Sequence, residues 1–299
     1  MTPSPIALFV YNRPKHTQQT VEALSKNFLA QESDLIIFSD GPKMEKDLEA
    51  VLRVREYVKS ITGFKSVQIV ESPMNKGLAK SIIDGVTEVL KENGTIIVLE
   101  DDIITSPYFL DFMNQALGLY ENEVEVISIH GYVYPVKDIL PETFFLRGAD
   151  CWGWATWRRG WSLFESDGAK LLSELKKRKL GRAFNFNNSF SYIKMLSDQI
   201  KGRNDSWAIR WHASAFLANK FTLYPGVSFV SNIGFDKSGT HSGLSKDFDV
   251  ALRKIGFNLK KIPIAEHADA FKAFSNYLKT VENSIFERVK RRIRRFFEQ

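Results

Sequence analysis

Three adjacent carboxylates, Glu100, Asp101 and Asp102, interrupt an otherwise apolar stretch, TIIVLEDDIITSPYF (residues 95–109). They follow a run of apolar and β-branched residues that is typical of a buried strand. Neighbouring carboxylates repel one another, and a divalent cation would offset that cost. Mg²⁺ and Mn²⁺ prefer oxygen ligands and often keep one or two protein carboxylates beside phosphates and water. The run therefore predicts a metal–diphosphate site, with a solvated acidic turn that caps the next helix as the alternative.

Polar residues also follow three other apolar runs, as Asn12-Arg13-Pro14, Ser39-Asp40-Gly41 and Asn75-Lys76-Gly77. In open α/β sheets, ligands bind just beyond the carboxyl ends of the strands. Asp40 is suited to accept a hydrogen bond from a base or ribose, and Arg13 or Lys76 is suited to face a phosphate or the base. Each segment alone is ordinary turn chemistry. Together at one edge they favour a nucleotide site.

Strands that alternate with helices must position these residues. Continuous apolar runs indicate strands covered on both faces; they span residues 5–12, 34–41, 66–72, 95–102 and 124–131. Helical patterns lie between them, at residues 14–29, 45–60, 77–92 and 106–120. This alternation predicts an α/β sandwich with a mainly parallel central sheet and helices on both faces.

The second half of the sequence is aromatic and more variable. Residues 147–161 hold four of the six tryptophans, residues 168–220 look mainly helical, and residues 221–235 return to strand-like text before a glycine-rich loop at 236–243. The spacing of Trp154, Trp157 and Trp161 on a helix favours core packing. We therefore expect only one of Trp152 or Trp154 to line a sugar site.

Composition excludes several classes of protein. The 299 residues are 44% hydrophobic and 25% charged, as in an ordinary globular protein. The single cysteine, Cys151, allows no internal disulfide and fits a reducing cytosol. We expect neither a cleaved leader nor a membrane span, since no apolar run approaches the ~20 residues that a span needs. The dinucleotide and P-loop glycine motifs are absent from the sequence.

The basic charge is concentrated at the C-terminus. Residues 287–299 hold six basic and two acidic residues, out of a net charge of +6 for the whole chain. Over residues 285–298 apolar side chains fall on one helical face, which is typical of a helix in a membrane interface. Packing of this helix on its own domain and nucleic-acid binding are the alternatives. No aromatic–basic interleaving occurs elsewhere, so we expect no nucleic acid partner but a cytoplasmic protein, peripheral at the inner face of the membrane.

Over roughly residues 6–245 the sequence resembles inverting glycosyltransferases of the GT-A fold, as in N-acetylglucosaminyltransferase I and bacterial family 2-like sugar transferases. The likeness rests on the order of five features: the first strand with its arginine, SDG after the second strand, the apolar-EDD-apolar run, the CWGWATW segment and the late GTHSG loop. It implies a nucleotide-diphospho-sugar transferase sandwich.

The resemblance also implies roles for single residues. Asp102 would bind Mn²⁺ or Mg²⁺ at the donor diphosphate, Asp101 would reach the ribose, and Glu100 would support the site near the donor sugar. Asp40 would contact the base or ribose. His241 in the late loop is a possible third metal ligand.

For the catalytic base the resemblance points to Asp205, in RNDSW (203–207). A base must reach the acceptor hydroxyl, the metal neutralises the leaving diphosphate, and a closing loop excludes water. Asp205 could equally cap the helix that follows. Asp150, which opens the tryptophan segment, is a second candidate on the sugar side.

These observations together predict a metal-dependent inverting glycosyltransferase of bacterial surface polysaccharide synthesis, such as that of lipopolysaccharide or capsule. Its donor would be a nucleotide sugar, and a UDP-sugar is the first candidate. Its acceptor would be a glycan or a lipid-linked oligosaccharide. Residues 1–245 would form the transferase domain, with a nucleotide half (1–131) and an acceptor half with the closing loop (132–245). Residues 246–299 would form a helical region with the basic tail.

Two other functions stay open. A sugar nucleotidyltransferase would also use acids and metal, but the first strand is not followed by the glycine-rich basic loop that its chemistry wants. A non-catalytic calcium- or sugar-binding module would not explain the three other polar strand ends.

Overall fold

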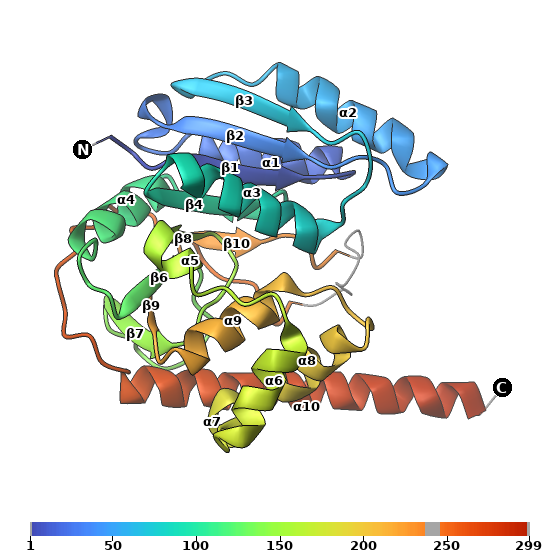
Figure 1. Cartoon of the computed structure of the whole chain (residues 1–299), viewed down its shortest axis with the longest axis vertical. Coiled ribbons are helices and arrows are strands. Elements are labelled where there is room, and N and C mark those ends of the chain that lie inside the picture. The colour runs from blue at the N-terminus through green and yellow to red at the C-terminus, as the bar shows by residue number, and fades with distance from the viewer. Residues whose placement is uncertain (1, 237–245, 298–299) are drawn as a thin grey trace.

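The computed structural model describes residues 2–236 and 246–297, with side chains described as far as residue 283. Its centre is an eight-stranded sheet (Figure 1). Side by side, the strands are β3 (Ser66–Glu71), β2 (Asp34–Ser39), β1 (Ile6–Val10), β4 (Thr95–Glu100), β8 (Trp154–Trp157), β6 (Val126–His130), β9 (Phe221–Pro225) and β7 (Thr143–Arg147). All but β7 and β8 run in the same direction. The predicted α/β sandwich with a mainly parallel sheet is confirmed.

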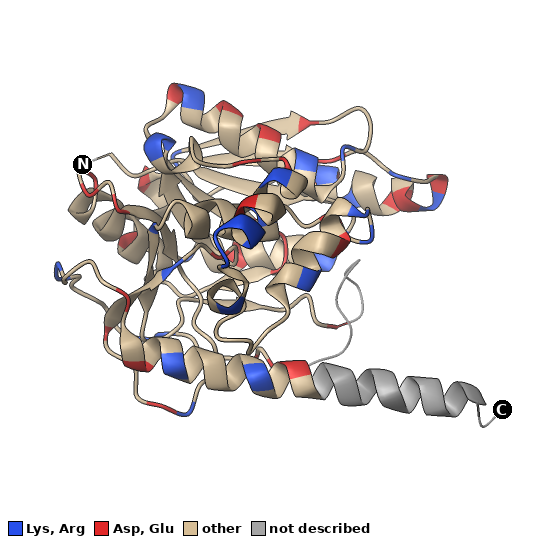
Figure 2. Cartoon of the chain, turned by 60° about the horizontal axis from the view of Figure 1, so that its bottom comes forward, with Lys and Arg blue, Asp and Glu red and all other residues tan. Residues whose placement is uncertain are grey.

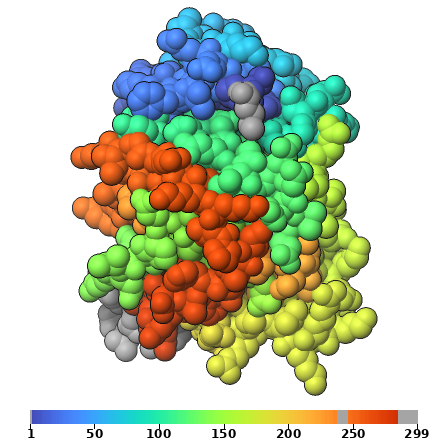
Figure 3. Space-filling model, turned by 90° about the vertical axis from the view of Figure 1, so that its left-hand side faces the viewer, coloured from blue at the N-terminus to red at the C-terminus, as the bar shows by residue number. Residues whose placement is uncertain are grey.

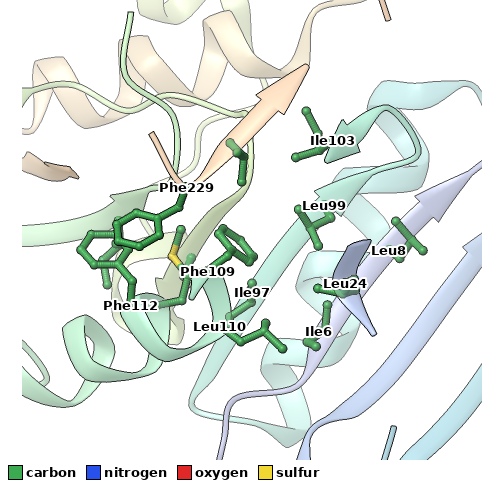
Figure 4. Close-up of a cluster of buried hydrophobic side chains, with 14 of the residues drawn as sticks. Ile6, Leu8, Leu24, Ile97, Leu99, Ile103, Phe109, Leu110, Phe112 and Phe229 are labelled. Atoms are coloured by element: carbon green, nitrogen blue, oxygen red, sulfur yellow. The ribbon is translucent and has the colours of Figure 1, made fainter. Parts of the chain in front are cut away.

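Helices cover both faces of the sheet. On one face lie α1 (Pro14–Leu24), α2 (Leu48–Lys59) and α4 (Phe109–Leu119), which pack on Ile6, Leu8 and the other residues of one side of β1. Figure 4 shows this cluster, with Leu24 and Leu110 near Ile6 and Ile97 of the sheet and Phe112 stacked on Phe229. On the other face lie α3 (Leu78–Glu92), α5 (Arg158–Trp161) and α9 (Trp207–Leu217), packed on Ala7 and Phe9. The runs that form β1, β4 and β6 are therefore strands buried on both faces, as predicted. The prediction is wrong for β2, where buried and half-buried residues alternate, and for the edge strand β3, which has no buried residue.

The predicted helices of the first half begin where their sequences indicate. Pro14 is the first residue of α1, where its missing N–H costs nothing. A short 3₁₀ turn (Glu45–Asp47) leads into α2, and another (Ala30–Glu32) follows α1. Gly77 caps α3 with φ +78°, a conformation that favours glycine. Each helix lies within its predicted range.

Two strands of the central sheet, β7 and β8, were not predicted. β8 pairs antiparallel with both β4 and β6 and so joins the two halves of the sheet. Trp154 and Trp157 belong to this strand and Trp161 to the helix after it, so the prediction that all three share one helix is wrong. Their predicted core position is confirmed, since all three are buried.

The variable half places helices and an irregular segment around the sheet. The predicted helical region contains α6 (Gly168–Lys177), α7 (Gly181–Phe184) and α8 (Tyr192–Ile200), which pack against α9. β5 (Ile103–Thr105) and β10 (Val230–Asn232) form a separate two-stranded sheet. Phe248, Phe257 and Ile264 of the next segment pack on the core, and Figure 3 shows this part of the chain in orange, across elements of the first half in green.

The C-terminal helix α10 (Ala268–Phe297) begins well inside the region 246–299 that was predicted to be helical. Its first turns are part of the fold, because Ala270, Phe274 and Leu278 pack with residues of β7 and β9. Up to residue 283, α10 includes both acidic residues (Asp269, Glu282) and lysines (Lys272, Lys279), drawn in red and blue in Figure 2. The side chains of the basic tail lie outside the described residues, so membrane binding through residues 285–298 stays a prediction. Within the described part, no helix has the length and apolar character of a membrane span.

Candidate active site

The acidic triplet lies at the carboxyl end of β4, as predicted. Glu100 is the last residue of β4, and Asp101 and Asp102 form the turn into β5. Asp101 is only 4% exposed. Its carbonyl oxygen accepts a 2.9 Å hydrogen bond from the Thr20 hydroxyl, and that of Asp102 accepts one of 2.9 Å from the Ile233 amide. Helix α1 and the segment after β10 therefore fix the backbone of the turn.

Arg13, at the carboxyl end of the neighbouring strand β1, bridges the two aspartates. One terminal nitrogen, Nη2, donates to Asp101 Oδ1 and, over 2.9 Å, to Asp102 Oδ2. Nε lies 3.4 Å from Asp101 Oδ2. Arg13 and two acids of the triplet, Asp101 and Asp102, therefore meet at one edge of the sheet, as the strand ends indicate.

Burial and mutual repulsion shape the charges of the triplet. Burial, reinforced by the neighbouring carboxylates of Asp102 and Asp101, raises the pKa of Glu100 to about 8. Burial also raises the pKa of Asp101, an effect that the nearby Arg13 opposes. Burial alone would lower the pKa of Arg13, but the carboxylates of Asp101 and Asp102 hold it above its ordinary value. The edge therefore concentrates more negative charge than one guanidinium offsets, which suits a further cation.

The carboxylate of Asp40, at the end of β2, binds the loop before α3. It accepts hydrogen bonds from the amides of Lys76 (2.8 Å), Gly77 (3.0 Å) and Gly41 (2.9 Å), and from the side chain of Asn75 (3.1 Å). These bonds fill the acceptor sites of a carboxylate. Asp40 therefore positions the 75–77 loop, and its direct contact with a base or ribose stays a prediction.

The side chain of Lys76 is exposed, and its Nζ lies 3.9 Å from Asp84 Oδ2. It reaches neither the triplet nor Arg13 through any described contact. Its predicted contact with a nucleotide stays a prediction.

Asp205 comes to the same edge from the second half of the chain. It is exposed, and its Oδ2 lies 3.5 Å from the place where a Cβ on Gly77 would stand. The alternative that Asp205 caps α9 is wrong, because the hydroxyl of Ser206 caps this helix by accepting from Ile209 N at 3.2 Å. Asp205 therefore lies beside the 75–77 loop without capping α9.

Trp207, in the first turn of α9, contributes a contact that the sequence did not indicate. Its indole N–H hydrogen-bonds the carboxylate of Glu100 and favours the charged form of that group. The contact links the helix that begins beside Asp205 to the end of β4. Nothing in the sequence separates this tryptophan from those that serve only the core.

Asp150 lies in a second polar cluster, next to Cys151. Its Oδ1 accepts the Cys151 amide at 2.9 Å, and its Oδ2 lies 3.4 Å from the Tyr134 hydroxyl and 3.9 Å from His130 Nδ1. Burial, with the charges of Asp150, Glu100 and Asp102, raises the pKa of the Cys151 thiol. The charges of Asp150 and of the triplet therefore both reach Cys151, which places Asp150 in the surroundings of the candidate site.

The two tryptophans predicted as alternatives for a sugar site differ clearly. Trp154 is fully buried and packs against Trp161, Trp207 and Trp211, so it cannot line a sugar site. Trp152 is half-buried. Its amide donates to His130 Nε2 at 3.1 Å. The prediction of a sugar platform therefore passes to Trp152.

The start of the late glycine-rich loop approaches the acidic turn. Gly234 packs so closely on Asp102 that a Cβ there would stand 2.2 Å from Asp102 Oδ2. Asp236 Oδ2 lies 3.2 Å from His16 Nε2, on the first turn of α1. His241 lies outside the described residues, so its role as a metal ligand stays a prediction.

The donor atoms at this edge fit a hard cation. No group of three His, Cys, Asp or Glu side chains poised to ligate a metal occurs within residues 2–236 and the described part that follows the loop. However, Mg²⁺ commonly takes only one or two protein carboxylates and completes its shell with phosphate oxygens and water. Asp101 and Asp102 supply this set.

Comparison with known proteins adds little. No protein-family model and no curated protein matches the sequence. Two similar solved structures are the mannosyltransferase PcManGT from Pyrobaculum calidifontis in complex with GDP-Man and Mn²⁺, and TarS from S. aureus. Both align at 14% identity and a TM-score of 0.31, over 46% and 48% of this chain but only 39% and 24% of theirs. At such TM-scores these likenesses carry no argument.

Proposed function

We propose that this chain transfers a sugar from a nucleotide-diphosphate donor to a hydroxyl acceptor, with inversion at the anomeric carbon and with Mn²⁺ or Mg²⁺ as cofactor. One observation carries the proposal. Three carboxylates, half-buried or buried, lie at the carboxyl end of β4, and two of them, Asp101 and Asp102, contact Arg13 from the end of β1. A parallel sheet binds its ligands at this edge, and such a cluster suits a cation that carries phosphate.

In the proposed mechanism Asp102 and Asp101 would hold the cation, which would supply positive charge to neutralise the leaving diphosphate. Asp205, exposed beside the 75–77 loop, takes the proton of the acceptor hydroxyl. Asp40 keeps that loop in place through hydrogen bonds from Asn75, Lys76 and Gly77. Glu100 supports the site next to the donor sugar and is itself held by Trp207.

The partners are proposed from the sequence. A UDP-sugar donor and a glycan or lipid-linked acceptor of bacterial surface polysaccharide follow from the resemblance of the sequence. Peripheral binding to the membrane follows from the composition of residues 285–298. Asp150 and Trp152, which flank Cys151 in the sequence, are the residues proposed to contact sugar.

The test is calorimetric titration of UDP, GDP and dTDP into the protein, with and without Mn²⁺. One nucleotide should bind only with the metal, and Asp102→Asn should abolish that binding because it removes the proposed metal ligand. The control is Asp34→Asn, which changes an aspartate at the opposite, amino end of the sheet, bound to Lys65 and Ser66. Absence of nucleotide binding in every condition would contradict the proposed function.

A further inference from the structure

We infer that Arg13 is a built-in counter-cation of Asp101 and Asp102 and that it competes with the divalent metal for these two carboxylates. The inference rests on the proposed function, because it concerns the same pair of aspartates. It adds that metal entry requires Arg13 to leave its present position. The guanidinium acts here as a gate on the metal site.

The contacts of Arg13 support competition rather than simple proximity. The same terminal nitrogen donates to an oxygen of each aspartate, so the guanidinium sits between the two carboxylates. The side chains are 17% exposed for Arg13, 6% for Asp101 and 13% for Asp102. Little room is left for a cation that would bind the oxygens between them.

The aspartates cannot easily turn away from Arg13 to meet a metal elsewhere. Gly234 crowds the same oxygen of Asp102 that Arg13 contacts, since a Cβ on Gly234 would stand 2.2 Å from Oδ2. The turn itself is fixed by the hydrogen bonds from Thr20 and Ile233 to its carbonyl oxygens. The metal and Arg13 therefore need the same face of the pair.

Arg13 itself can move only by its side chain. Its carbonyl oxygen accepts from both the amide and the hydroxyl of Thr17, each at 3.0 Å, and Pro14 follows it directly. A guanidinium stays charged at any physiological pH, so it repels a metal that stays beside it. Released from the aspartates, its planar set of donors matches the oxygens of a phosphate group. Arg13 would thus exchange a carboxylate partner for the donor diphosphate.

The experiment measures Mn²⁺ affinity alone, by calorimetry or by the electron paramagnetic resonance signal of free Mn²⁺, on the full chain without nucleotide. Arg13→Gln should bind Mn²⁺ at least about tenfold more tightly than the wild type, because it frees both carboxylates. Arg13→Lys should fall between the two, since an ammonium keeps the charge but loses the planar fork. Lys15→Gln is the matched control, as it removes an exposed positive charge two residues away and should change little.

Equal or weaker Mn²⁺ binding in Arg13→Gln and Arg13→Lys would overturn the inference and leave the proposed metal site intact. Absence of Mn²⁺ binding in the wild type and in every variant would overturn it as well, and would also count against the metal in the proposed function. Measurable binding in Arg13→Gln alone would support competition. Circular dichroism checks the fold of each variant, and if Arg13→Gln does not fold, the order of Arg13→Lys and wild type decides.

Discussion

At the scale of single residues, the site depends on hydrogen bonds between segments that are distant in sequence. The carboxylate of Glu100 accepts a hydrogen bond from the indole N–H of Trp207, and that of Asp40 accepts hydrogen bonds from the 75–77 loop. The sequence places Asp40 and Glu100 at strand ends, because their positions follow from the apolar runs. It cannot show which donor reaches them, because that depends on how α3 and α9 pack on the sheet.

We predict that Trp207→Phe destabilises the protein more than Trp211→Phe does. Both tryptophans are buried in the same cluster, so both variants leave a similar cavity. Only Trp207 donates to a buried carboxylate, whereas the indole nitrogen of Trp211 has no partner among the described residues. Loss of that donor should cost about 1–3 kcal/mol more.

Urea unfolding of the two variants at pH 7.5 measures this difference. Equal losses of unfolding free energy would show that the hydrogen bond to Glu100 contributes nothing to stability.

At the scale of elements, the sequence predicts the parallel strands of the first half but not the antiparallel strands β7 and β8. The four parallel strands β1 to β4 are continuous apolar runs, and each was predicted with its helix. β7 and β8 are short, aromatic and antiparallel, and the tryptophans of β8 have a spacing that also fits a helix. Only pairing with β4 and β6 makes β8 a strand, and that pairing is a property of the assembled sheet.

The segment after β10 should control the geometry of the acidic turn. We predict that Gly234→Ala lowers the affinity for Mn²⁺ at least about tenfold, because the new Cβ would collide with Asp102 Oδ2. Gly94→Ala is the control, since a Cβ at this exposed glycine before β4 meets nothing within 4 Å. The measurement is the same Mn²⁺ titration. Unchanged affinity in Gly234→Ala would mean that Asp102 does not ligate the metal or that the segment yields freely.

At the scale of the whole molecule, buried titratable groups couple stability to pH. Burial lowers the pKa of His212, a residue of α9 that lies against Ala149 and within reach of the charges of Asp150 and Arg147. Below the ordinary histidine value of 6.5, the unfolded chain binds a proton that the folded chain refuses. Stability from this group is therefore complete above pH 6.5 and is lost as the pH falls below it.

We predict that the wild type loses more unfolding free energy than His212→Asn when the pH falls from 7.5 to 5.5. The difference should approach 1.4 kcal/mol per pH unit below 6.5, that is, about 1.4 kcal/mol over this range. Comparison with the variant is essential, because the raised pKa of Glu100 acts in the opposite sense: its folded form gains a proton as the pH falls. Urea titrations at both values measure the effect. Parallel losses in the two proteins would show that His212 is not buried in its neutral form.

Strand β8 also carries a consequence for how the chain reaches its native state during synthesis. It fills the gap between β4 and β6, yet both of these strands precede it in the chain. As the polypeptide emerges from the ribosome, the edge of β4 therefore stays open until residues 154–157 arrive. An open edge of an apolar strand invites association with other chains. Between the synthesis of Glu100 and that of Trp154, a nascent chain of this protein is thus exposed to association through this edge.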